Sequence, residues 1–567
     1  MSAAHQIGFK GILRPIHPTA KIIAGIQSLP SLEEFPGHID AAFIGVNRYA
    51  TLDIVAQLRS LGAGGAICFA SGFSEASEED ATGHDLQTQL ITAAGDMPIL
   101  GPNCYGFLNA FDGCGIWPDQ HGCRKVESGV AILTQSSNIA INLTMQTRGL
   151  PIGYVITCGN QAQTSQSDVG LHLLDDPRVT AIGLHIEGFG DLRSWEALAH
   201  KAHAKNIPLI ALKSGKTQQA QTAAVSHTAS VAGSDAGAEA LLARLSIRRA
   251  DSLPVFLEAL KLSHQFGQLT SNRIASISCS GGEAALAVDT AHTTKLTFPK
   301  LNSRQRTDLK AALGPMVALA NPLDYHTYIW RNETAMTKAW AAMADPDIAL
   351  TLLISDYPRA DICDPSDWDC VTNAAIAAAQ QTKRPYAVVA SLAELMPEHI
   401  AKTLMANGVA AMNGLDHGIQ AVDLLTRQLS QDLNPVLLPG ADRDAKLMDE
   451  HVAKQNLARH GLLIPRGIKV LDRTKAAQAA MAVGFPVALK TLGLAHKTGS
   501  NGLALNLNSS EEVNAALLNL APGSVLIEHM IAGTVTELLV GVTRDPAHGF
   551  VLTIAAGGTM TELLDDR

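Results

Sequence analysis

The sequence predicts an α/β protein in which parallel sheets are covered by helices on both faces, followed by a C-terminal α+β domain. Two observations lead to this prediction. Short apolar runs bounded by Gly, Pro or Asn recur along the chain, and an Ala- and Leu-rich stretch with helical spacing follows each of them. Apolar runs without polar alternation are typical of strands buried on both faces, and the intervening helices supply that cover.

The predicted strands form successive series along the chain. Those of the first part lie at residues 41–46, 65–70, 130–134, 154–157, 181–186 and 208–212. The pattern restarts near Val130 and again near Arg273, and it changes after Pro435. Residues 434–441 combine two prolines with a glycine, which is typical of a linker between domains.

The portion after this linker has a different pattern. Its apolar runs alternate with polar residues or pair as antiparallel strands do, and they lie at residues 485–490, 503–508, 525–528 and 536–542. One helix is predicted over residues 510–520. This mixture predicts the α+β domain.

The composition excludes several classes of protein. Only 17% of the 567 residues are charged and 47% are hydrophobic, which indicates large buried cores and excludes a disordered chain. The 53 acidic and 43 basic residues give a net charge of −10 without a Lys/Arg-rich block, so a general nucleic-acid binder is excluded. The eight cysteines form no CxxC pair, and no apolar stretch reaches the roughly 18–20 residues that span a bilayer. We therefore expect a cytoplasmic protein with neither a nucleic-acid nor a membrane partner.

Ligands of open parallel sheets bind beyond the carboxyl ends of the strands, so the turns after predicted strands are candidate sites. Leu100-Gly-Pro-Asn-Cys-Tyr-Gly and Cys158-Gly-Asn-Gln are two such turns, and a plain turn is the alternative interpretation of the first. Thr134-Gln-Ser-Ser-Asn opens a helix predicted over residues 139–148 and ended by Gly149. Its free N–H groups and helix dipole would hold an anion such as phosphate, although an ordinary helix cap has the same sequence.

The most specific turn covers residues 224–237. His227 lies there among small and hydroxyl residues, ahead of a second helix start marked by Ser234 and Asp235. A histidine is usually a bystander, but phosphoryl transfer through an imidazole requires this setting, because the ring must be open to attack and near anion-binding N–H groups. Glu187, at the end of the strand at 181–186, is the candidate acceptor that orients the ring.

These motifs together resemble the NDP-forming acyl-CoA synthetases, relatives of succinyl-CoA synthetase. The resemblance rests on Gly101-Pro-Asn-Cys-Tyr-Gly, Gln135-Ser-Ser, Gly159-Asn-Gln, Leu174-Asp-Asp-Pro, Glu187-Gly, Ser226-His-Thr, Ser278-Cys-Ser-Gly-Gly-Glu and Asn321-Pro-Leu-Asp. Their order and spacing match over nearly the whole chain. The family's ATP-grasp domain is matched by Leu489-Lys, His496-Lys, Gly502, Glu537-Leu-Leu-Val-Gly-Val and Asp545.

The resemblance implies four domains. They are a Rossmann-like CoA-binding domain over residues 1–126, a succinyl-CoA-ligase-like flavodoxin domain with the phosphohistidine over 127–268, a second CoA-ligase-like flavodoxin domain over 269–432 and an ATP-grasp domain over 440–567. The implied reaction joins a carboxylate to CoA while ATP is converted to ADP and phosphate, through an acyl phosphate and a phosphohistidine. CoA, ATP or ADP and Mg²⁺ are the implied cofactors. The implied partners are a small carboxylic acid or its acyl-CoA, and further copies of the chain in a homo-oligomer.

The resemblance also implies roles for individual residues. His227 matches the phosphohistidine, Glu187 the carboxylate that holds its imidazole, and His496 a second phosphohistidine found in some members. The walls of the acyl and phosphate site match Asn103, Cys104, Gln135, Ser136, Ser137, Gly159 and Asn160. The nucleotide contacts match Lys490, Glu528 and Glu537. A thioester on Cys104 is disfavoured, because the family assigns that thiol no covalent role.

Both ends of the sequence depart from the family pattern. No GxGxxG-like turn lies in residues 1–40, where the family's CoA loop is expected, and the sequence ends at Arg567 inside the ATP-grasp domain. We therefore expect a truncated chain whose metal ligands would lie beyond Arg567. The alternative to an active ligase is a catalytically incomplete acyl-CoA-binding or regulatory protein of the same fold. A flavodoxin-like hydrolase is disfavoured, because no Gly-x-Ser-x-Gly turn follows a strand. The sequence leaves open the acid and the choice between ADP and GDP.

Overall fold

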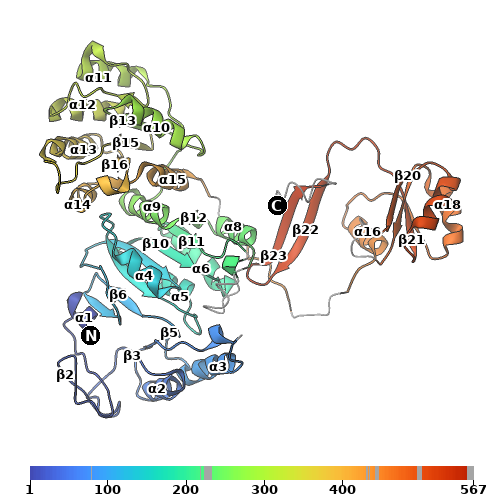
Figure 1. The fold of residues 1–567 in the computed structure, drawn as a ribbon, viewed down its shortest axis with the longest axis horizontal. Coiled ribbons are helices and arrows are strands. Elements are labelled where there is room, and N and C mark those ends of the chain that lie inside the picture. Colours follow the sequence, from blue (N-terminus) through green and yellow to red (C-terminus); the bar gives the residue numbers. More distant parts are fainter. Residues whose placement is uncertain are drawn as a thin grey trace. The chain divides into compact units, whose positions relative to one another are not determined.

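The structure is a computed structural model that describes residues 1–557 apart from residues 78, 218, 222–232, 430, 431, 433, 441–445 and 494–500 (Figure 1). It divides into two compact units. The first comprises Met1–Leu437 and Arg544–Val551, and the second comprises Leu438–Thr543 and Leu552–Arg567. The predicted α/β class, with parallel sheets followed by an antiparallel one, is confirmed.

The first unit opens with a three-stranded parallel sheet. Its strands, in spatial order, are β3 (Ala42–Ile44), β4 (Ala66–Cys68) and β5 (Ile99–Leu100). The elements around it are α1 (Ser2–Gln6), β1 (Ile22–Ile23), β2 (Ile26–Gln27), α2 (Arg48–Ser60), η1 (Ser74–Ala76) and α3 (Gly83–Ala94). α2 and α3 lie side by side (Figure 1) and bury Val55, Leu58 and Leu90 in a core shared with the strands.

A seven-stranded sheet contains the predicted strands between residues 130 and 212. Its members, in spatial order, are β12 (Arg248–Ala250), β11 (Leu209–Lys213), β10 (Val179–Ile186), β8 (Gly129–Thr134), β9 (Ile152–Thr157), β6 (Phe107–Asn109) and β7 (Cys114–Ile116). β8 to β12 are parallel, whereas β6 and β7 add an antiparallel edge. Every residue of β8 is buried, as expected for a strand covered on both faces.

The helices of this sheet begin where side chains cap them. They are α4 (Ser137–Thr144), α5 (Gln166–Leu173), α6 (Leu192–Ala204), α8 (Asp235–Arg244) and α9 (Leu253–Phe266). The α4 helix ends before the predicted stop at Gly149. The Gln146 side chain accepts the N–H of Arg148 and donates to the carbonyl of Leu150, so the backbone turns there instead of continuing the helix.

The third sheet is entirely parallel. Its strands, in spatial order, are β14 (Leu323–Asp324), β13 (Ile274–Ser278), β15 (Leu350–Ile354), β16 (Tyr386–Ala390) and β17 (Val409–Asn413). Its helical elements are α10 (Gly281–Ala291), α11 (Ser303–Leu313), η2 (Gly314–Met316), α12 (Glu333–Met343), η3 (Ser366–Trp368), α13 (Asp369–Thr382), η4 (Ala393–Leu395), α14 (Glu398–Ala406) and α15 (Leu415–Thr426).

Helix α9 joins the second and third sheets into one core. It packs against β10, β11 and β12 of the second sheet and against β17 and α15 of the third. Every residue from Val255 to Ser263 is buried, including Glu258 and Lys261. The Glu258 carboxylate pairs with Arg148 and lies 2.8 Å from the Lys261 Nζ, which donates to Asn413 Oδ1 at 2.8 Å. The charges buried with this helix are therefore paired across the contact between the two sheets.

The second unit is built on an antiparallel sheet. Its strands, in spatial order, are β18 (Gly467–Val470), β21 (Val525–His529), β19 (Val487–Thr491) and β20 (Leu503–Leu507). Its helical elements are α16 (Glu450–Arg459), η5 (Arg473–Lys475), α17 (Ala476–Val483) and α18 (Ser510–Asn519). β22 (Leu538–Asp545) and β23 (Gly549–Ala556) form a hairpin whose tip, Arg544–Val551, belongs to the first unit.

The predicted linker has no helix or strand among its described residues. Its start is held on the first unit, because the Val436 N–H donates to the Glu196 carboxylate and the Val436 carbonyl accepts from Arg193 at 2.9 Å. Across the described part of the chain, every helix is too short or too polar to cross a membrane.

Candidate functional site

The candidate site lies where the second sheet reverses its winding. The chain proceeds from β8 outward to β9 on one side, and β10 starts the series on the other side. In doubly wound sheets, the turns at such a reversal are where ligands bind. Gln135, Ser136 and Ser137 follow β8, and Glu187 follows β10, so four predicted site residues lie at this position.

Gln135 connects the two turns. Its side chain is buried, its Nε2 donates to the Gly188 carbonyl at 2.7 Å, and its Oε1 accepts the N–H groups of Glu187 and Gly188. All these bonds go to the backbone that carries Glu187. Gln135 therefore holds the turn at Glu187 and Gly188, called the carboxylate turn below. Its amide group is used in these bonds and is not available to bind a ligand.

Ser136 caps the start of α4 and Ser137 opens the helix. The Ser136 Oγ accepts the N–H of Ile139, and the Ser136 N–H donates to Thr134 Oγ1 at 2.9 Å. Thr134 Oγ1 lies 3.1 Å from the Nδ1 of His185, whose Nε2 lies 2.9 Å from Ser214 Oγ. The ends of β8, β10 and β11 are thus joined by buried hydrogen bonds, with the N-terminal end of α4 beside them.

The other two predicted turns meet at the same edge. The N–H groups of Asn160 and Ala162 donate to the carbonyls of Pro102 and Gly101, each at 3.0 Å. The Gly159 backbone has φ +53°, and a Cβ there would lie 2.2 Å from the Pro102 carbonyl oxygen. Only glycine permits this approach. The Tyr105 N–H donates to Ser137 Oγ at 3.2 Å, which connects these turns to α4.

Asn160 also reaches the first sheet through a residue that the sequence did not indicate. Its Nδ2 donates to the Glu75 carboxylate, which accepts the N–H of Gly72 at 2.7 Å. The Oδ1 of Asn160 is buried and has no hydrogen-bond partner among the described residues. A buried polar atom left open in this way fits a site that a bound ligand completes.

Asn103 and Cys104 lie in the turn after β5 but differ in exposure. Asn103 is half-buried with a left-handed backbone, φ +60°, and its N–H donates to the Ala70 carbonyl. The Cys104 side chain is buried, and burial raises the pKa of its thiol well above the ordinary value. Burial likewise raises the pKa values of Cys68 and Cys158 to about 12. Because a thiolate is needed for attack, these values disfavour a thioester on Cys104.

Lys213 is a further charged residue at this edge that the sequence did not indicate. It ends β11, is buried, and its Nζ donates to the Glu187 carbonyl at 3.0 Å and to the Ser214 carbonyl. Burial, with the nearby Arg249 charge, lowers the pKa of Lys213 to about 8. A lysine inside an apolar strand pattern does not by itself indicate a functional residue. Its position at the end of a strand could have marked Lys213 as a candidate site residue.

A carboxylate with altered ionisation lies in the third sheet. Glu283 is in the first turn of α10, after β13, and belongs to the motif Ser278-Cys-Ser-Gly-Gly-Glu. Burial, together with the charges of Asp356 and Asp324, raises the pKa of Glu283 to about 7. This group can exchange a proton near neutral pH, although the sequence identified only its motif.

Both predicted phosphohistidines, His227 and His496, lie outside the described residues. The described chain enters the segment of His227 after β11 and leaves it at Gly233 and Ser234, where α8 begins with Ser234 as its cap. The predicted helix start at Ser234 and Asp235 is therefore confirmed.

The predicted nucleotide residues lie in the second unit. Lys490 on β19 pairs with Glu528 on β21, at 2.9 Å, and with Glu450 on α16, at 2.8 Å. Burial lowers the pKa of Lys490, but these two carboxylates outweigh it and raise the value to about 12. Lys454 pairs with the same two carboxylates, so the cluster is balanced in charge. Glu537 is exposed and lies just before β22.

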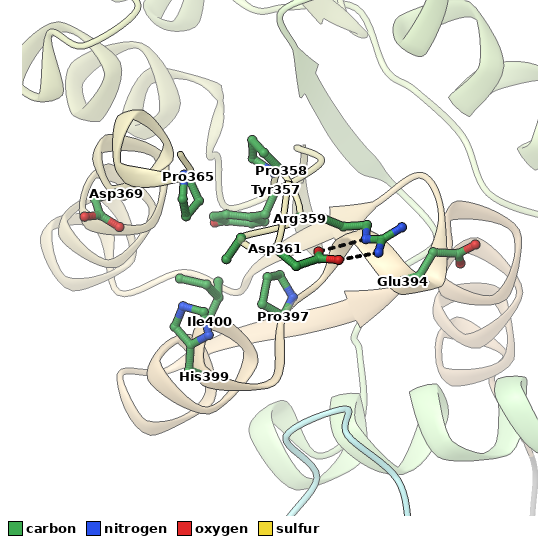
Figure 2. A pocket seen from close by; sticks show the side chains of 11 residues that line it. Tyr357, Pro358, Arg359, Asp361, Pro365, Asp369, Glu394, Pro397, His399 and Ile400 are labelled. Carbon is green, nitrogen blue, oxygen red and sulfur yellow. Dashed lines mark hydrogen bonds and ion pairs between the residues drawn. The ribbon is translucent and has the colours of Figure 1, made fainter. Parts of the chain in front are cut away.

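A cavity of about 310 Å³ lies in the third sheet, apart from these residues (Figure 2). It opens beyond the carboxyl ends of β15 and β16, and its lining includes Tyr357, Pro397 and Ile400. Arg359 and Asp361 are ion-paired at its wall. Within the described part of the chain, no group of three or more His, Cys, Asp or Glu side chains is placed to hold a metal ion.

Three family models match the chain. They are a CoA binding domain over residues 4–110, a succinyl-CoA ligase like flavodoxin domain over residues 127–263 and an ATP-grasp domain over residues 441–567. The CoA binding model covers the first sheet and the turn after β5, and the middle model covers the turns after β8, β9 and β10. The ATP-grasp model covers the second unit and the hairpin tip.

Curated relatives span nearly the whole chain. Trans-feruloyl-CoA synthase, from an unknown prokaryotic organism, is 28% identical over 99% of this chain and 82% of its own length. The ADP-forming acetate–CoA ligase of Methanocaldococcus jannaschii is 25% identical over 98% of this chain and 83% of its own length. Among solved structures, acetyl-coenzyme A synthetase 1 of Ca. Korarchaeum cryptofilum, in complex with phosphate and ADP, superposes with a TM-score of 0.64. It is 23% identical and covers 75% of this chain and 90% of its own, a likeness of fold.

Proposed function

Because the chain belongs to the NDP-forming acyl-CoA synthetase family, with CoA-binding, succinyl-CoA ligase-like and ATP-grasp domains, we propose that it interconverts a carboxylate, CoA and ATP with an acyl-CoA, ADP and phosphate. The observation that carries the proposal is the meeting of four turns at the β8 and β10 strand ends. These turns bring together three features. They are the N-terminal end of α4, which can bind an anion, the turn that carries Glu187, and the buried Asn160 Oδ1, which has no hydrogen-bond partner among the described residues.

The acyl half of the reaction is assigned to these turns. Phosphate attacks the carbonyl carbon of the acyl-CoA, the C–S bond breaks, and CoA leaves as its thiol while an acyl phosphate forms. The N-terminal N–H groups of α4, with Ser136 and Ser137, would hold the phosphate, because a helix start favours an anion. Asn103, Gly159 and Asn160 would form the wall beside the acyl group.

The phosphoryl relay is assigned to His227. A ring nitrogen of His227 attacks the phosphorus of the acyl phosphate, the P–O bond to the acyl group breaks, and the carboxylate leaves. Glu187 would accept the hydrogen bond of the other ring nitrogen and stabilise the charged ring. Gln135 holds Glu187 in place through its backbone. The phosphoryl group then passes to ADP, with His496 as a second carrier, while Lys490 and Glu528 would contact the nucleotide. Mg²⁺, when bound, would neutralise charge on the nucleotide phosphates.

The ion pairs of Lys490 restrict how this residue can bind the phosphates of the nucleotide. In this structure Glu450 and Glu528 occupy two of the three N–H donors of Lys490, so the lysine can make a single contact to a phosphate and needs to release one carboxylate to make a second. Glu450 comes from α16, whereas Glu528 is on the strand next to Lys490. We assign the exchange to Glu450, whose helix lies outside the sheet.

Phosphohistidine formation tests the proposal. Incubation with γ-labelled ATP and Mg²⁺ is expected to leave acid-labile, base-stable phosphate on the protein. Peptide mapping should find the label on His227. His227→Ala should abolish the label at position 227 and leave only label on His496, Glu187→Gln should lower the label on His227 at least tenfold, and the exposed His172→Ala should retain it. Loss of the label on addition of CoA with acetate or ferulate would identify the acid. An unlabelled protein, or a labelled protein in which His227 carries no phosphate, would overturn the proposal.

A further inference from the structure

The tip of the β22–β23 hairpin contacts the start of helix α8. The Asp545 Oδ2 accepts the backbone N–H of Ser234 at 3.0 Å and its hydroxyl at 2.9 Å, although the two residues are 311 positions apart. The Asp545 Oδ1 accepts the N–H groups of Ala547, at 2.8 Å, and His548, at 3.1 Å. One carboxylate therefore ties the tip to itself and to the cap of α8.

This contact is favourable in charge as well as in geometry. The first N–H groups of a helix have no partner within the helix and carry a partial positive charge, which a carboxylate stabilises. Burial raises the pKa of Asp545, but the hydrogen bonds from Ser234 and Ala547 outweigh it, so the pKa is lowered. Asp545 is thus an anion supplied by the chain itself at the start of α8.

The His548 side chain packs into a small recess at the start of α8, called the notch here, which is formed by Gly233, Gly237 and Phe189. Its ring is buried and packs edge to face against Phe189, with ring centroids 5.4 Å apart. A Cβ on Gly233 would lie 2.3 Å from the ring, and a Cβ on Gly237 would lie 2.7 Å from its Nδ1. The two glycines leave the space that the ring occupies. Phe189 is two residues beyond Glu187, so the notch adjoins the carboxylate turn.

The position of Ser234 limits how far His227 can reach. His227 precedes Ser234 by seven positions, so their Cα atoms lie within about 25 Å of each other. On the other side, Gln221 precedes His227 by six positions, and its N–H donates to the Thr217 carbonyl at 2.8 Å. Ser234 is therefore one of two described points close to His227 in sequence, and it is the one that Asp545 holds.

We propose that Asp545 is a positioning residue for phosphoryl transfer, and that with His548 it fixes the point where the segment of His227 joins α8. The inference rests on the proposed function. Without this contact, the first turn of α8 can unwind, so that the nearest fixed residue on this side lies farther from His227 along the sequence and the proposed placement of His227 beside Glu187 is less favoured. Asp545 touches no reacting atom and acts through Ser234.

Two variants remove the contact from opposite sides. Asp545→Asn weakens the acceptor, whereas Gly237→Ala places a methyl group where His548 lies and removes no functional group. The same methyl group would lie 2.7 Å from the Ser234 Oγ, so Gly237→Ala disturbs the cap of α8 together with the His548 contact, even though alanine itself favours a helix by about 1 kcal/mol relative to glycine. Asp545→Glu keeps the charge and is the conservative variant. Asn302→Ala removes the cap of α11 in the third sheet and is the matched control.

The experiment combines hydrogen exchange with labelling kinetics on the full chain. Asp545→Asn and Gly237→Ala are each expected to raise amide exchange at Ser234 and in the first turn of α8 about tenfold or more. They should also lower the rate of His227 labelling by γ-labelled ATP at least about fivefold, with little change in melting temperature. The double variant should be no slower than the slower single variant, Asp545→Glu should recover part of the rate, and Asn302→Ala should change neither quantity.

Separate results would overturn the two proposals. Wild-type exchange and a wild-type labelling rate in both variants would overturn the positioning role alone. Faster exchange with an unchanged labelling rate would also overturn it, because the contact would then be merely structural. A wild-type protein that takes no label on His227 would overturn the proposed function, and the positioning role with it.

Discussion

His185 is held in its neutral form by burial. Its ring lies between Thr134 and Ser214, with contacts of 3.1 Å and 2.9 Å, and only 4% of the residue is exposed. Burial, with a smaller contribution from the Lys213 charge, lowers the pKa of His185 to about 4. The hydrogen bonds that join β8, β10 and β11 therefore depend on an imidazole that does not take up a proton near neutral pH.

His185 should make the first unit less stable in acid. Between pH 6.5 and pH 4, His185 binds a proton in the unfolded chain but not in the folded chain. The free energy of unfolding therefore falls as the pH falls, and this contribution stops changing below pH 4. The loss is on the order of 3 kcal/mol. His185→Gln removes this contribution, so its melting temperature should fall less steeply than that of the wild type from pH 7 to pH 4.5. The exposed His172→Gln should keep the wild-type slope, and equal slopes for all three proteins would contradict the prediction.

Replacing Glu258 is expected to lower the free energy of unfolding more than replacing most other charged residues. Its side chain and that of Lys261 are completely buried, and removing one partner leaves the other charge without compensation. Glu258→Ala should lower the free energy of unfolding by about 3–5 kcal/mol, whereas Glu398→Ala, in an exposed pair with Lys402, should lower it by less than about 1 kcal/mol. Tryptophan fluorescence in urea measures this, because all five tryptophans lie in the first unit: Trp117, Trp195, Trp330, Trp340 and Trp368. A similar loss for both variants would contradict the prediction.

At the scale of elements, the packing of α9 on β10 depends on a glycine. A Cβ on Gly183 would lie 2.7 Å from the Phe256 ring and 2.8 Å from a Leu260 methyl group. Gly183→Ala should therefore lower the free energy of unfolding by about 1–3 kcal/mol. Gly282→Ala in α10 meets only an ordinary contact, 3.5 Å from Ser280 Oγ, and should be neutral or slightly stabilising. Urea titration followed by tryptophan fluorescence distinguishes them, and equal midpoints would refute the packing argument.

The buried strands could be predicted from the sequence, because a short apolar run without polar alternation is typical of a strand covered on both faces. The runs at 130–134 and 181–186 correspond to β8 and β10, with the site residues directly after them. Helix ends were less predictable. Gly149 is an obvious stop signal, yet the side chain of Gln146 turns the chain first, which is a local competition that residue type alone does not reveal.

The charged residues of the site were the least predictable part. Lys213 reads as the polar end of an apolar strand, and only the fold shows that its Nζ reaches the Glu187 carbonyl. The contact of Asp545 with Ser234 joins residues 311 positions apart, and no spacing rule covers such a pair. Local motifs therefore identified where the chemistry lies, whereas the residues that hold those motifs in place required the tertiary structure.

At the scale of the whole molecule, the first unit should fold without most of the second. Its hydrophobic clusters lie between Ala3 and Val436, and the hairpin tip adds only a few contacts around Ser234. A fragment of residues 1–437 should melt cooperatively, about 2–4 °C below the full chain when followed by tryptophan fluorescence. Exchange at Ser234 should rise in the fragment, as in Asp545→Asn. A fragment without a cooperative transition would show that residues 544–551 are essential to the core.

Helix α9 has a consequence for how the protein can be divided between genes. Because it is buried from Val255 to Ser263 between two sheets, it belongs to neither flavodoxin-like half alone. A break just after α9, between residues 266 and 273, would give two polypeptides that each expose an apolar surface, and the first would carry Glu258 and Lys261 without Asn413. A break in the linker after residue 437 leaves α9 and the two sheets that cover it on one polypeptide. Any natural or engineered two-gene version of this protein should therefore keep residues 127–426 in a single reading frame.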